Sequence, residues 1–216
     1  MKPDKEYKGR SHIRMFNCDC MDFMGIVKDP YDLAIVDPPY GNNAIFNGSA
    51  DFANKQKQYD NKIPDDVYFG MIRILSYNQI VWGGNYFTNN LNPSRGWIVW
   101  DKLRFVKNYS RYELAWTSFD TNTNGFTYCN NGGFIVKDVD KPKISPSQKP
   151  VQLYKWLLTN YAKEGDRILD THGGSLSIAI ACWDLGFDLD VCELDKDYFD
   201  MAVKRFENHI SQTQLF

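Results

Sequence analysis

Apolar residues along the chain fall into short runs, and several of these runs stop at an acidic residue. Seven runs have the length and content of strands: 12–17, 32–36, 79–82, 97–101, 112–117, 167–170 and 187–192. The spacing of apolar residues predicts helices over 20–28, 65–77, 150–161, 177–185 and 198–209. Strands that alternate with helices in this way predict an α/β fold, in which strands joined by a helix run parallel.

Three polar stretches interrupt this pattern. Residues 1–11 are expected to fray, and residues 119–147 are expected to form a loop. Residues 41–61 are rich in Asn, Gln, Lys and Asp and show no periodicity. So long a gap inside a compact domain is generally either functional or disordered. Because this stretch directly follows a strand, we expect a lid or a substrate-binding loop there.

The strand 32–36 ends in an unusual tetrapeptide, Asp37-Pro38-Pro39-Tyr40. The prolines lack an N–H and restrict the residues before them, so they end strand pairing and form a rigid corner. Such a corner suits a flat ring that bears an amino group, with Tyr40 stacked on the ring while Asp37 and a carbonyl accept its hydrogens. Taken alone, the tetrapeptide fits a plain strand-to-loop turn with a surface tyrosine equally well.

A second motif lies in the last third of the chain. The strand 167–170 enters a glycine turn at 173–175, and the next strand ends at Glu193, about 20 residues further on, where nucleotide-binding sheets place an acid that takes the ribose hydroxyls. The turn Gly173-Gly174-Ser175 is not GxGxxG, which weakens a dinucleotide interpretation. A cofactor with an adenosyl group and no pyrophosphate fits better, and S-adenosylmethionine meets that description. A turn made only for tight packing is the alternative.

Together these motifs resemble the amino-group DNA methyltransferases, in the class whose catalytic half precedes the cofactor half, and in particular the phage and prophage-type adenine enzymes. The tetrapeptide matches their catalytic motif, and 147–150 (SQKP) matches their Thr-Gln-Lys-Pro segment. Residues 170–177 (DTHGGSLS) resemble their Asp-Pro-Phe-x-Gly-Ser-Gly-Thr loop, 193–205 their Glu…Tyr…Ala…Arg signature, and 79–87 (QIVWGGNYF) the segment beside their target-base pocket. In the loop, Thr171 and His172 replace Pro-Phe, and Leu176 replaces the third glycine.

The resemblance implies a Rossmann-like, doubly wound, mostly parallel sheet of seven strands with a reversed hairpin strand. It divides one domain, 1–211, into a catalytic half (12–118), a short target-recognition connector (119–149) and a cofactor-binding half (150–211). The implied reaction is methyl transfer from S-adenosylmethionine to the N6 amine of a flipped-out adenine in DNA. The alternatives are N4-methylation of cytosine, disfavoured by Asp instead of Ser at position 37, methylation of RNA or a protein amide, and a non-catalytic nucleic-acid-binding module.

The resemblance also assigns residues to roles. The catalytic set is Asp37, Pro38, Pro39 and Tyr40. The cofactor-binding set is Asp19, Asp37, Lys149, Asp170, Gly173, Gly174, Ser175 and Glu193, and its acids follow predicted strand ends, so we expect them to converge on one crevice. The pocket segment and the cation-plus-aromatic loop 102–111 add a DNA-binding set: Tyr40, Gly41, Trp82, Asn85, Lys102, Arg104, Lys107 and Arg111. For that loop, a solvated surface hairpin is the alternative.

Composition and charge add limits. A net charge of −2 requires any nucleic-acid contact to come from a local basic patch. The five cysteines form no CxxC pair and the three histidines are scattered, so we expect free thiols and no metal site. No apolar run approaches the length of a membrane span, and we expect a cytoplasmic protein of bacterial or phage origin.

The last five residues form a separate motif. Residues 212–216 (QTQLF) resemble the Gln-x-x-Leu-Phe peptide by which bacterial replication proteins bind the sliding clamp. Gln212, Leu215 and Phe216 are therefore expected to contact a clamp, with docking of Leu215 and Phe216 on the protein's own surface as the alternative. The segments left for reading DNA are short, so we also expect a recognition site of a few base pairs or a homodimer.

Overall fold

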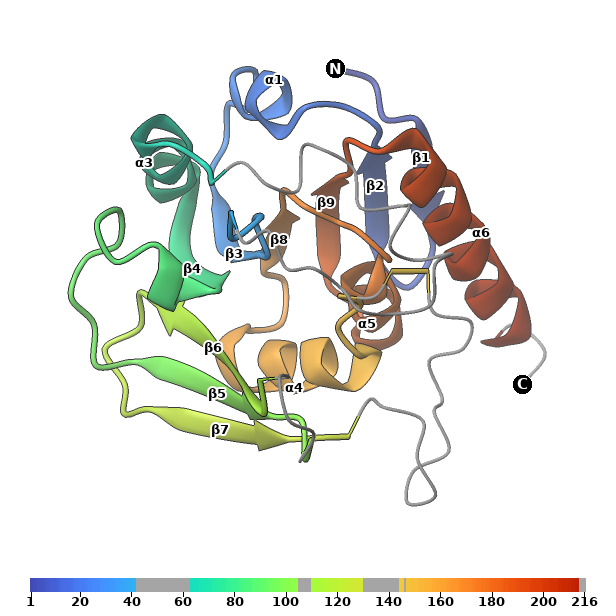
Figure 1. Ribbon diagram of the computed structural model, residues 1–216. Helices are drawn as coiled ribbons and strands as arrows, with labels where there is room; N and C mark the ends of the chain where they lie inside the picture. The colour runs from blue at the N-terminus through green and yellow to red at the C-terminus, as the bar shows by residue number, and fades with distance from the viewer. Residues whose placement is uncertain (42–62, 105–109, 130–143, 146, 214–216) are drawn as a thin grey trace.

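Five parallel strands form the centre of the sheet. The computed structural model describes residues 1–41, 63–104, 110–129, 144–145 and 147–213. The central strands lie in the order β2 (His12–Phe16), β9 (Asp188–Cys192), β8 (Arg167–Asp170), β3 (Tyr31–Val36) and β4 (Ser76–Trp82), as Figure 1 shows. Their near-continuous apolar sequences suit strands that are covered on both faces. The α/β class predicted from the sequence is confirmed.

Four further strands complete the sheet among the described residues. Beyond β4 lie β6 (Tyr112–Thr117) and β5 (Trp97–Asp101), each antiparallel to the strand before it, and then β7 (Asn124–Thr127), parallel to β5. At the opposite edge, β1 (Lys5–Lys8) runs antiparallel to β2. The reversed hairpin strand is therefore present as β6, but the described sheet has nine strands and not the expected seven.

The two unexpected strands lie at the sheet edges, where each pairs with one neighbouring strand and packs one aromatic side chain against a helix. In β1, Tyr7 packs on Phe206 with ring centroids 5.0 Å apart. In β7, Phe126 packs on Trp156 at 5.5 Å. The remaining residues of both strands are mostly exposed and polar. This is why 1–11 and 119–147 did not display a strand pattern, and the expectation of fraying and loop was wrong for these parts.

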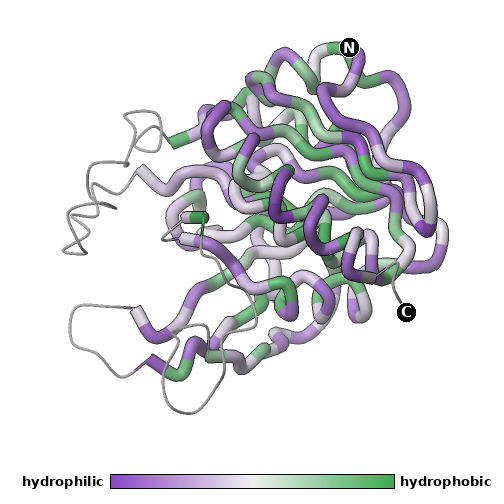
Figure 2. The backbone as a smooth tube through the Cα atoms, turned by 90° about the vertical axis from the view of Figure 1, so that its right-hand side faces the viewer, coloured by the Kyte–Doolittle hydropathy of each residue, from purple (hydrophilic) through white to green (hydrophobic). Residues whose placement is uncertain are grey.

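Helices cover both faces of the sheet. On one face lie α1 (Cys20–Met24) and α3 (Asp66–Leu75), and on the other lie α4 (Val151–Tyr161), α5 (Ser177–Leu185) and α6 (Lys196–Thr213) (Figure 1). Each layer has its own apolar cluster against the strands. Figure 2 shows hydrophobic positions along the strands, and alternating hydrophilic and hydrophobic positions on α6. None of the described helices has the length and hydropathy that a membrane crossing requires.

The strand order reverses between β8 and β3. From β8 the chain passes through α5 to β9 on one side, and from β3 through α3 to β4 on the other. In open α/β sheets, ligands bind at the carboxyl ends of the strands beside such a reversal. Asp170 is the last residue of β8, and Asp37 directly follows β3. The fold therefore brings these two acids to the edge of the sheet where a ligand site is expected.

Candidate active site

The carboxylate of Asp37 lies at the centre of the site. One oxygen, Oδ1, accepts a hydrogen bond of 2.5 Å from the hydroxyl of Tyr40. The other, Oδ2, accepts a hydrogen bond from the ammonium group of Lys149. The side chain of Asp37 remains 21% exposed, whereas Pro38 beside it is buried. The corner thus holds its carboxylate by two donors and still presents it to solvent.

The ring of Tyr40 lies flat against the loop that follows β4. It stacks on Tyr86 with centroids 5.1 Å apart and planes 16° apart. On the same loop, Gly83 has a left-handed backbone with φ of +69°, and a Cβ there would lie 2.2 Å from Cε1 of Tyr40. Only glycine lets the ring approach so closely. Sequence reasoning missed Gly83 and Tyr86, although the Gly-Gly pair of the segment 79–87 was a signal for such a close approach.

A buried lysine joins the corner to β6. Lys149, whose side chain is 4% exposed, bonds Asp37 and lies 3.4 Å from Oε2 of Glu113. Burial alone lowers the pKa of Lys149, but the charges of Asp37 and Glu113 more than offset this, and the net shift is upward. Lys149 is therefore charged at neutral pH, and it contacts three side chains: Asp37, Glu113 and the hydroxyl of Tyr40, the last at 3.4 Å. Glu113 was not among the predicted site residues, because its place beside Lys149 depends on the pairing of β6 with β4.

The glycine turn after β8 is fastened to the end of β9. The N–H of Gly173 donates to the carbonyl of Cys192 at 2.7 Å, and a Cβ on Gly173 would lie 2.6 Å from Cγ2 of Val191. The N–H of Gly174 donates to Oε2 of Glu193 at 2.7 Å. Glu193 is buried, and its other oxygen accepts the N–H of Asp195 at 2.8 Å. In the described structure, Glu193 therefore orders the turn that the sequence predicts as a cofactor loop.

The three residues that depart from the family pattern fit the local packing. Leu176 has φ of +55°, which is uncommon for a residue other than glycine, and its side chain is fully buried in the cluster under α5. Its side chain thus lies in the core. His172 packs edge-on against Tyr68 at 5.5 Å and shares a 2.9 Å hydrogen bond with Thr171. Burial lowers the pKa of His172 to about 4, so the ring is neutral at pH 7.

Three carboxylates converge at the ends of β3, β8 and β9. The pKa of Asp170 is raised to about 8, chiefly by burial and further by the charges of Asp37 and Glu193, against a 2.9 Å hydrogen bond from the N–H of His172. Three of the four acids that were expected to converge thus lie close enough for their charges to affect one another. A buried acid among acids favours a cationic ligand, and S-adenosylmethionine carries both an ammonium and a sulfonium group. The residues of this edge therefore fit that cofactor.

Replacing Asp170 with asparagine is expected to stabilise the cofactor-free protein at high pH. Its pKa lies near 4 in an unfolded chain and at about 8 in the folded protein. Between these values the folded form binds the extra proton, so the free energy of unfolding falls as pH rises. Asp170→Asn has no such titration. Its advantage in Tm over the wild type should grow from pH 4 to pH 8 by roughly 8–18 °C, or about 4–5 kcal/mol. Parallel Tm curves for the two proteins would contradict the shift.

Asp19 and Ser175 complete the predicted cofactor set. Asp19 is exposed just after β2, where its side chain accepts the N–H of Met21 at 2.8 Å and begins α1. Ser175 is buried and its hydroxyl shares a 3.1 Å hydrogen bond with Ser177. Both residues therefore have structural roles, at the same sheet edge as the three carboxylates, and their contacts with a cofactor stay predictions.

Two residues of the predicted DNA-binding set face inward. Trp82 is fully buried, with its ring 5.1 Å from the ammonium of Lys149, so it forms a wall of the site and is not accessible to DNA. Lys102 is only 15% exposed and bonds Oε1 of Glu113 at 3.0 Å. The prediction that these two side chains are available to DNA was wrong for the free protein. Alternation along a strand determines which face a residue occupies, and the sequence around these residues did not show which face that is.

The other members of this set differ in their surroundings. Gly41, with φ of +67°, directly follows the corner, and Asn85 is exposed beside Tyr86. Arg111 makes a two-bond ion pair with Asp101, at 2.9 and 2.6 Å, and so ties the ends of β5 and β6. Arg104 is partly buried. Lys107 lies outside the described residues, as do most of the predicted lid 41–61 and both Leu215 and Phe216.

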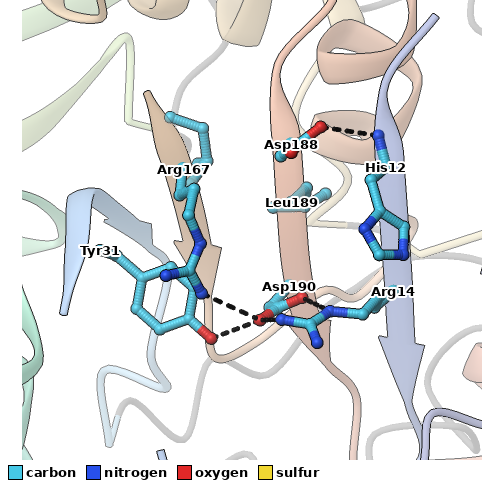
Figure 3. Close-up of a pocket in the computed structure, with 8 residues that line it drawn as sticks. His12, Arg14, Tyr31, Arg167, Asp188, Leu189 and Asp190 are labelled. Atoms are coloured by element: carbon cyan, nitrogen blue, oxygen red, sulfur yellow. Dashed lines mark hydrogen bonds and ion pairs between the residues drawn. The ribbon is translucent and has the colours of Figure 1, made fainter. Parts of the chain in front are cut away.

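A second cluster of charges lies toward the amino-terminal ends of the central strands, away from the three carboxylates. Figure 3 shows Asp190, which is buried, bonded to Arg14 at 2.6 Å and to the hydroxyl of Tyr31 at 2.5 Å. Arg167 lies over the ring of Tyr31 at 4.8 Å. The cavity beside them measures about 30 Å³, enough for about one water molecule. These groups satisfy one another and join the starts of four strands, so this cluster is structural.

Comparisons with known proteins find similar sequences and structures among one class of enzymes. Residues 31–204 match a family model described as DNA methylase. The chain is 24% identical over 217 residues to the type II methyltransferase M.HpaI of Haemophilus parainfluenzae, covering 83% of this chain and 69% of that protein. It is similar in structure to M1.HpyAVI in complex with SAM (TM-score 0.60, 16% identity, 89% of this chain and 98% of that one). It is also similar to the cytosine-N4-specific PvuII DNA methyltransferase (TM-score 0.61, 13% identity, 93% and 91%).

Proposed function

Because this chain belongs to the DNA methylase family, matched over residues 31–204, we propose that it methylates the N6 amine of adenine in a short DNA sequence. The chain is a DNA methyltransferase that uses S-adenosylmethionine, and adenine is the target base that we propose. The observation that supports the proposal is the carboxylate of Asp37, held at the corner and still open to solvent.

The chemistry of the corner addresses the weakness of the nucleophile. An exocyclic amine reacts poorly because its lone pair is delocalised into the ring. When bound, S-adenosylmethionine supplies an electrophilic methyl group on its sulfonium. Asp37 and the carbonyl of Pro38 accept the two hydrogens of the amine, which localises the lone pair on nitrogen. The carboxylate also stabilises the positive charge that develops on this nitrogen as it takes the methyl group, and it can accept the proton that the methylated amine then loses.

The target amine must first leave the base stack. In a duplex this nitrogen is out of reach, so the base is flipped into the site or presented in a single strand. We propose that it stacks on the aromatic pair of Tyr40 and Tyr86. In the free protein their centroids are 5.1 Å apart, too close for a third ring between them. The base must therefore lie on an outer face of the pair or displace Tyr86, which is exposed.

Sequencing of modified bases tests the target. The chain would be expressed in a host that lacks DNA methylation, and modified bases mapped strand by strand. We expect N6-methyladenine within one short sequence. N4-methylcytosine instead would overturn adenine and establish the alternative that the PvuII enzyme represents by its description. An unmodified genome, together with measurable binding of S-adenosylmethionine, would indicate a non-catalytic DNA-binding module.

Three further proposals concern partners. We propose that DNA is read by segments within 41–64, 102–111 and 119–149, if necessary with help from a second subunit. A footprint that leaves all three segments unprotected would contradict this.

We also propose that residues 212–216 bind a sliding clamp. α6 extends to Thr213, so Gln212 belongs to this helix. Clamp binding that is unchanged on deleting 212–216 would exclude the second proposal. A restriction endonuclease that cuts the unmethylated sequence would be the third partner.

A further inference from the structure

Beside the corner, charged side chains of alternating sign form a row. We call Lys102, Glu113, Lys149 and Asp37 the charge row. Its members come from the residue after β5, from β6, from the residue before Pro150 and from the residue after β3. Lys102 bonds Glu113 at 3.0 Å, Lys149 lies 3.4 Å from Glu113, and Lys149 bonds Asp37. The catalytic carboxylate is thus linked to a second carboxylate through one lysine.

In the free protein, Lys149 opposes the task of Asp37. The ammonium group cancels the negative charge that should meet a target amine, and it occupies one of the two carboxylate oxygens. Lys149 cannot turn to solvent, because its side chain is buried against the ring of Trp82. A buried ammonium without a carboxylate is strongly unfavourable. If Lys149 is to release Asp37, a second carboxylate must lie within its reach, because the hydroxyl of Tyr40, 3.4 Å away, carries no charge.

We propose that Glu113 is a positioning residue that takes over Lys149 when the target amine binds at Asp37. For this exchange the bond of Lys149 to Asp37 must break and the 3.4 Å contact to Oε2 of Glu113 must shorten. A lysine suits it, because its ammonium has three donors on a flexible stem. The exchange frees Oδ2 of Asp37 for the reacting amine and changes no net charge, because the two lysines and two carboxylates of the charge row sum to zero. This inference rests on the proposed function and adds a residue that acts through another.

Lys102 prepares Glu113 for this role. Burial raises the pKa of Glu113, but the charges of Lys149 and Lys102 outweigh it, and the net shift is downward. Glu113 therefore stays ionised beside Lys149 at neutral pH. Its oxygens are divided between the two lysines, Oε1 toward Lys102 and Oε2 toward Lys149. Glu113 thus has one oxygen available for Lys149 when Asp37 is taken up by the amine.

The first test is a double-mutant cycle measured as single-turnover methylation of genomic DNA from a methylation-free host. Glu113→Gln should lower the maximal rate on the order of 10²-fold, the lower end for loss of one preorganised polar group. The DNA concentration that gives half of the maximal rate should change by less than about threefold, since no DNA contact is lost. In a Lys149→Met background the same change should cost less than about threefold. An equal cost in both backgrounds would overturn the proposal, because Glu113 would then act independently of Lys149.

Glu207→Gln is the matched control. Glu207 also bonds a lysine, Lys5 at 3.2 Å, but does so at the β1 edge of the sheet, remote from the charge row. Its substitution should leave the rate unchanged. Glu113→Asp keeps the charge and should recover part of the rate. A Glu113→Asp protein as slow as Glu113→Gln, with an unchanged melting curve, would count against the exchange.

A second measurement does not depend on turnover. The ¹⁵Nζ signal of Lys149, assigned by its loss in Lys149→Met, should shift when an oligonucleotide with the mapped site and S-adenosylhomocysteine are added. The shift should be absent in Glu113→Gln. A signal that stays in place in the wild type would overturn the exchange even where a variant fails to fold. Failure of the proposed function would show itself separately, as a wild-type protein that incorporates no methyl group into DNA.

Discussion

Asp37→Ala is expected to slow methyl transfer on the order of 10²-fold or more while leaving the fold intact. The change removes the acceptor of one amine hydrogen and the charge that stabilises the amine as it takes the methyl group. It also leaves Lys149 with Glu113, 3.4 Å away, as its carboxylate partner. The protein should therefore stay folded, since the buried ammonium keeps a carboxylate partner. Single-turnover methylation and the far-UV spectrum together test this expectation.

Two substitutions sharpen the result. Asp37→Asn keeps the shape of the side chain and removes its charge, so it should be nearly as slow as Asp37→Ala. Asp200→Asn changes an exposed acid that pairs with Lys196 on α6, and it should have the wild-type rate. Near-normal methylation by a folded Asp37→Ala protein would refute the role assigned to the corner.

Gly83→Ala is expected to reduce the rate by about 10- to 100-fold and to destabilise the protein by about 1–3 kcal/mol. The added Cβ would lie 2.2 Å from Cε1 and 2.5 Å from Cδ1 of the Tyr40 ring, so the ring must leave its place on Tyr86. The left-handed backbone, with φ of +69°, adds strain of about 1–2 kcal/mol for any residue with a Cβ. Displacing Tyr40 also removes its 2.5 Å hydrogen bond to Asp37.

Gly70→Ala provides the matched control. Gly70 lies within α3, and outside its own stretch of helix backbone and its chain neighbours no atom lies within 4 Å of the position that its Cβ would take. The same chemical change there should raise stability by about 0.5–1 kcal/mol, because alanine favours a helix, and should leave methylation unchanged. Denaturant unfolding and methylation of both variants decide the question. A Gly83→Ala protein that matches Gly70→Ala in both measurements would show that the contact with Tyr40 is unimportant.

Much of the fold followed from local sequence pattern. The strands 97–101, 112–117 and 167–170 and the helix 177–185 have the predicted limits. These segments have apolar runs or helical spacing that end at clear stop signals, such as Gly186 after α5. The edge strands β1 and β7 lack such a pattern, because each buries little more than one aromatic side chain.

Residues of the site could be predicted only where they belong to a short sequence motif. Asp37, Asp170 and Glu193 could be placed because each lies at a strand end or directly after one. The contact of Lys149 with Asp37 joins residues 112 positions apart, and that of Glu113 with Lys149 depends on how β6 pairs. Trp82 and Lys102 were misassigned because a sequence shows residue type but not the direction in which a side chain points. Contacts between distant segments therefore needed the structure.

The order of strands also governs when the protein can fold during its synthesis. β2 pairs with β9, and Arg14 on β2 bonds Asp190 on β9 across 176 residues of chain. Until the last strand leaves the ribosome, β2 has only β1 as a neighbour, and the gap between β2 and β3 is unfilled. Contacts between such distant residues form slowly, since the intervening loop must close first. The catalytic corner is thus translated early but acquires its neighbours late. Truncated chains that stop before β9 should therefore have no methyltransferase activity and should not modify DNA.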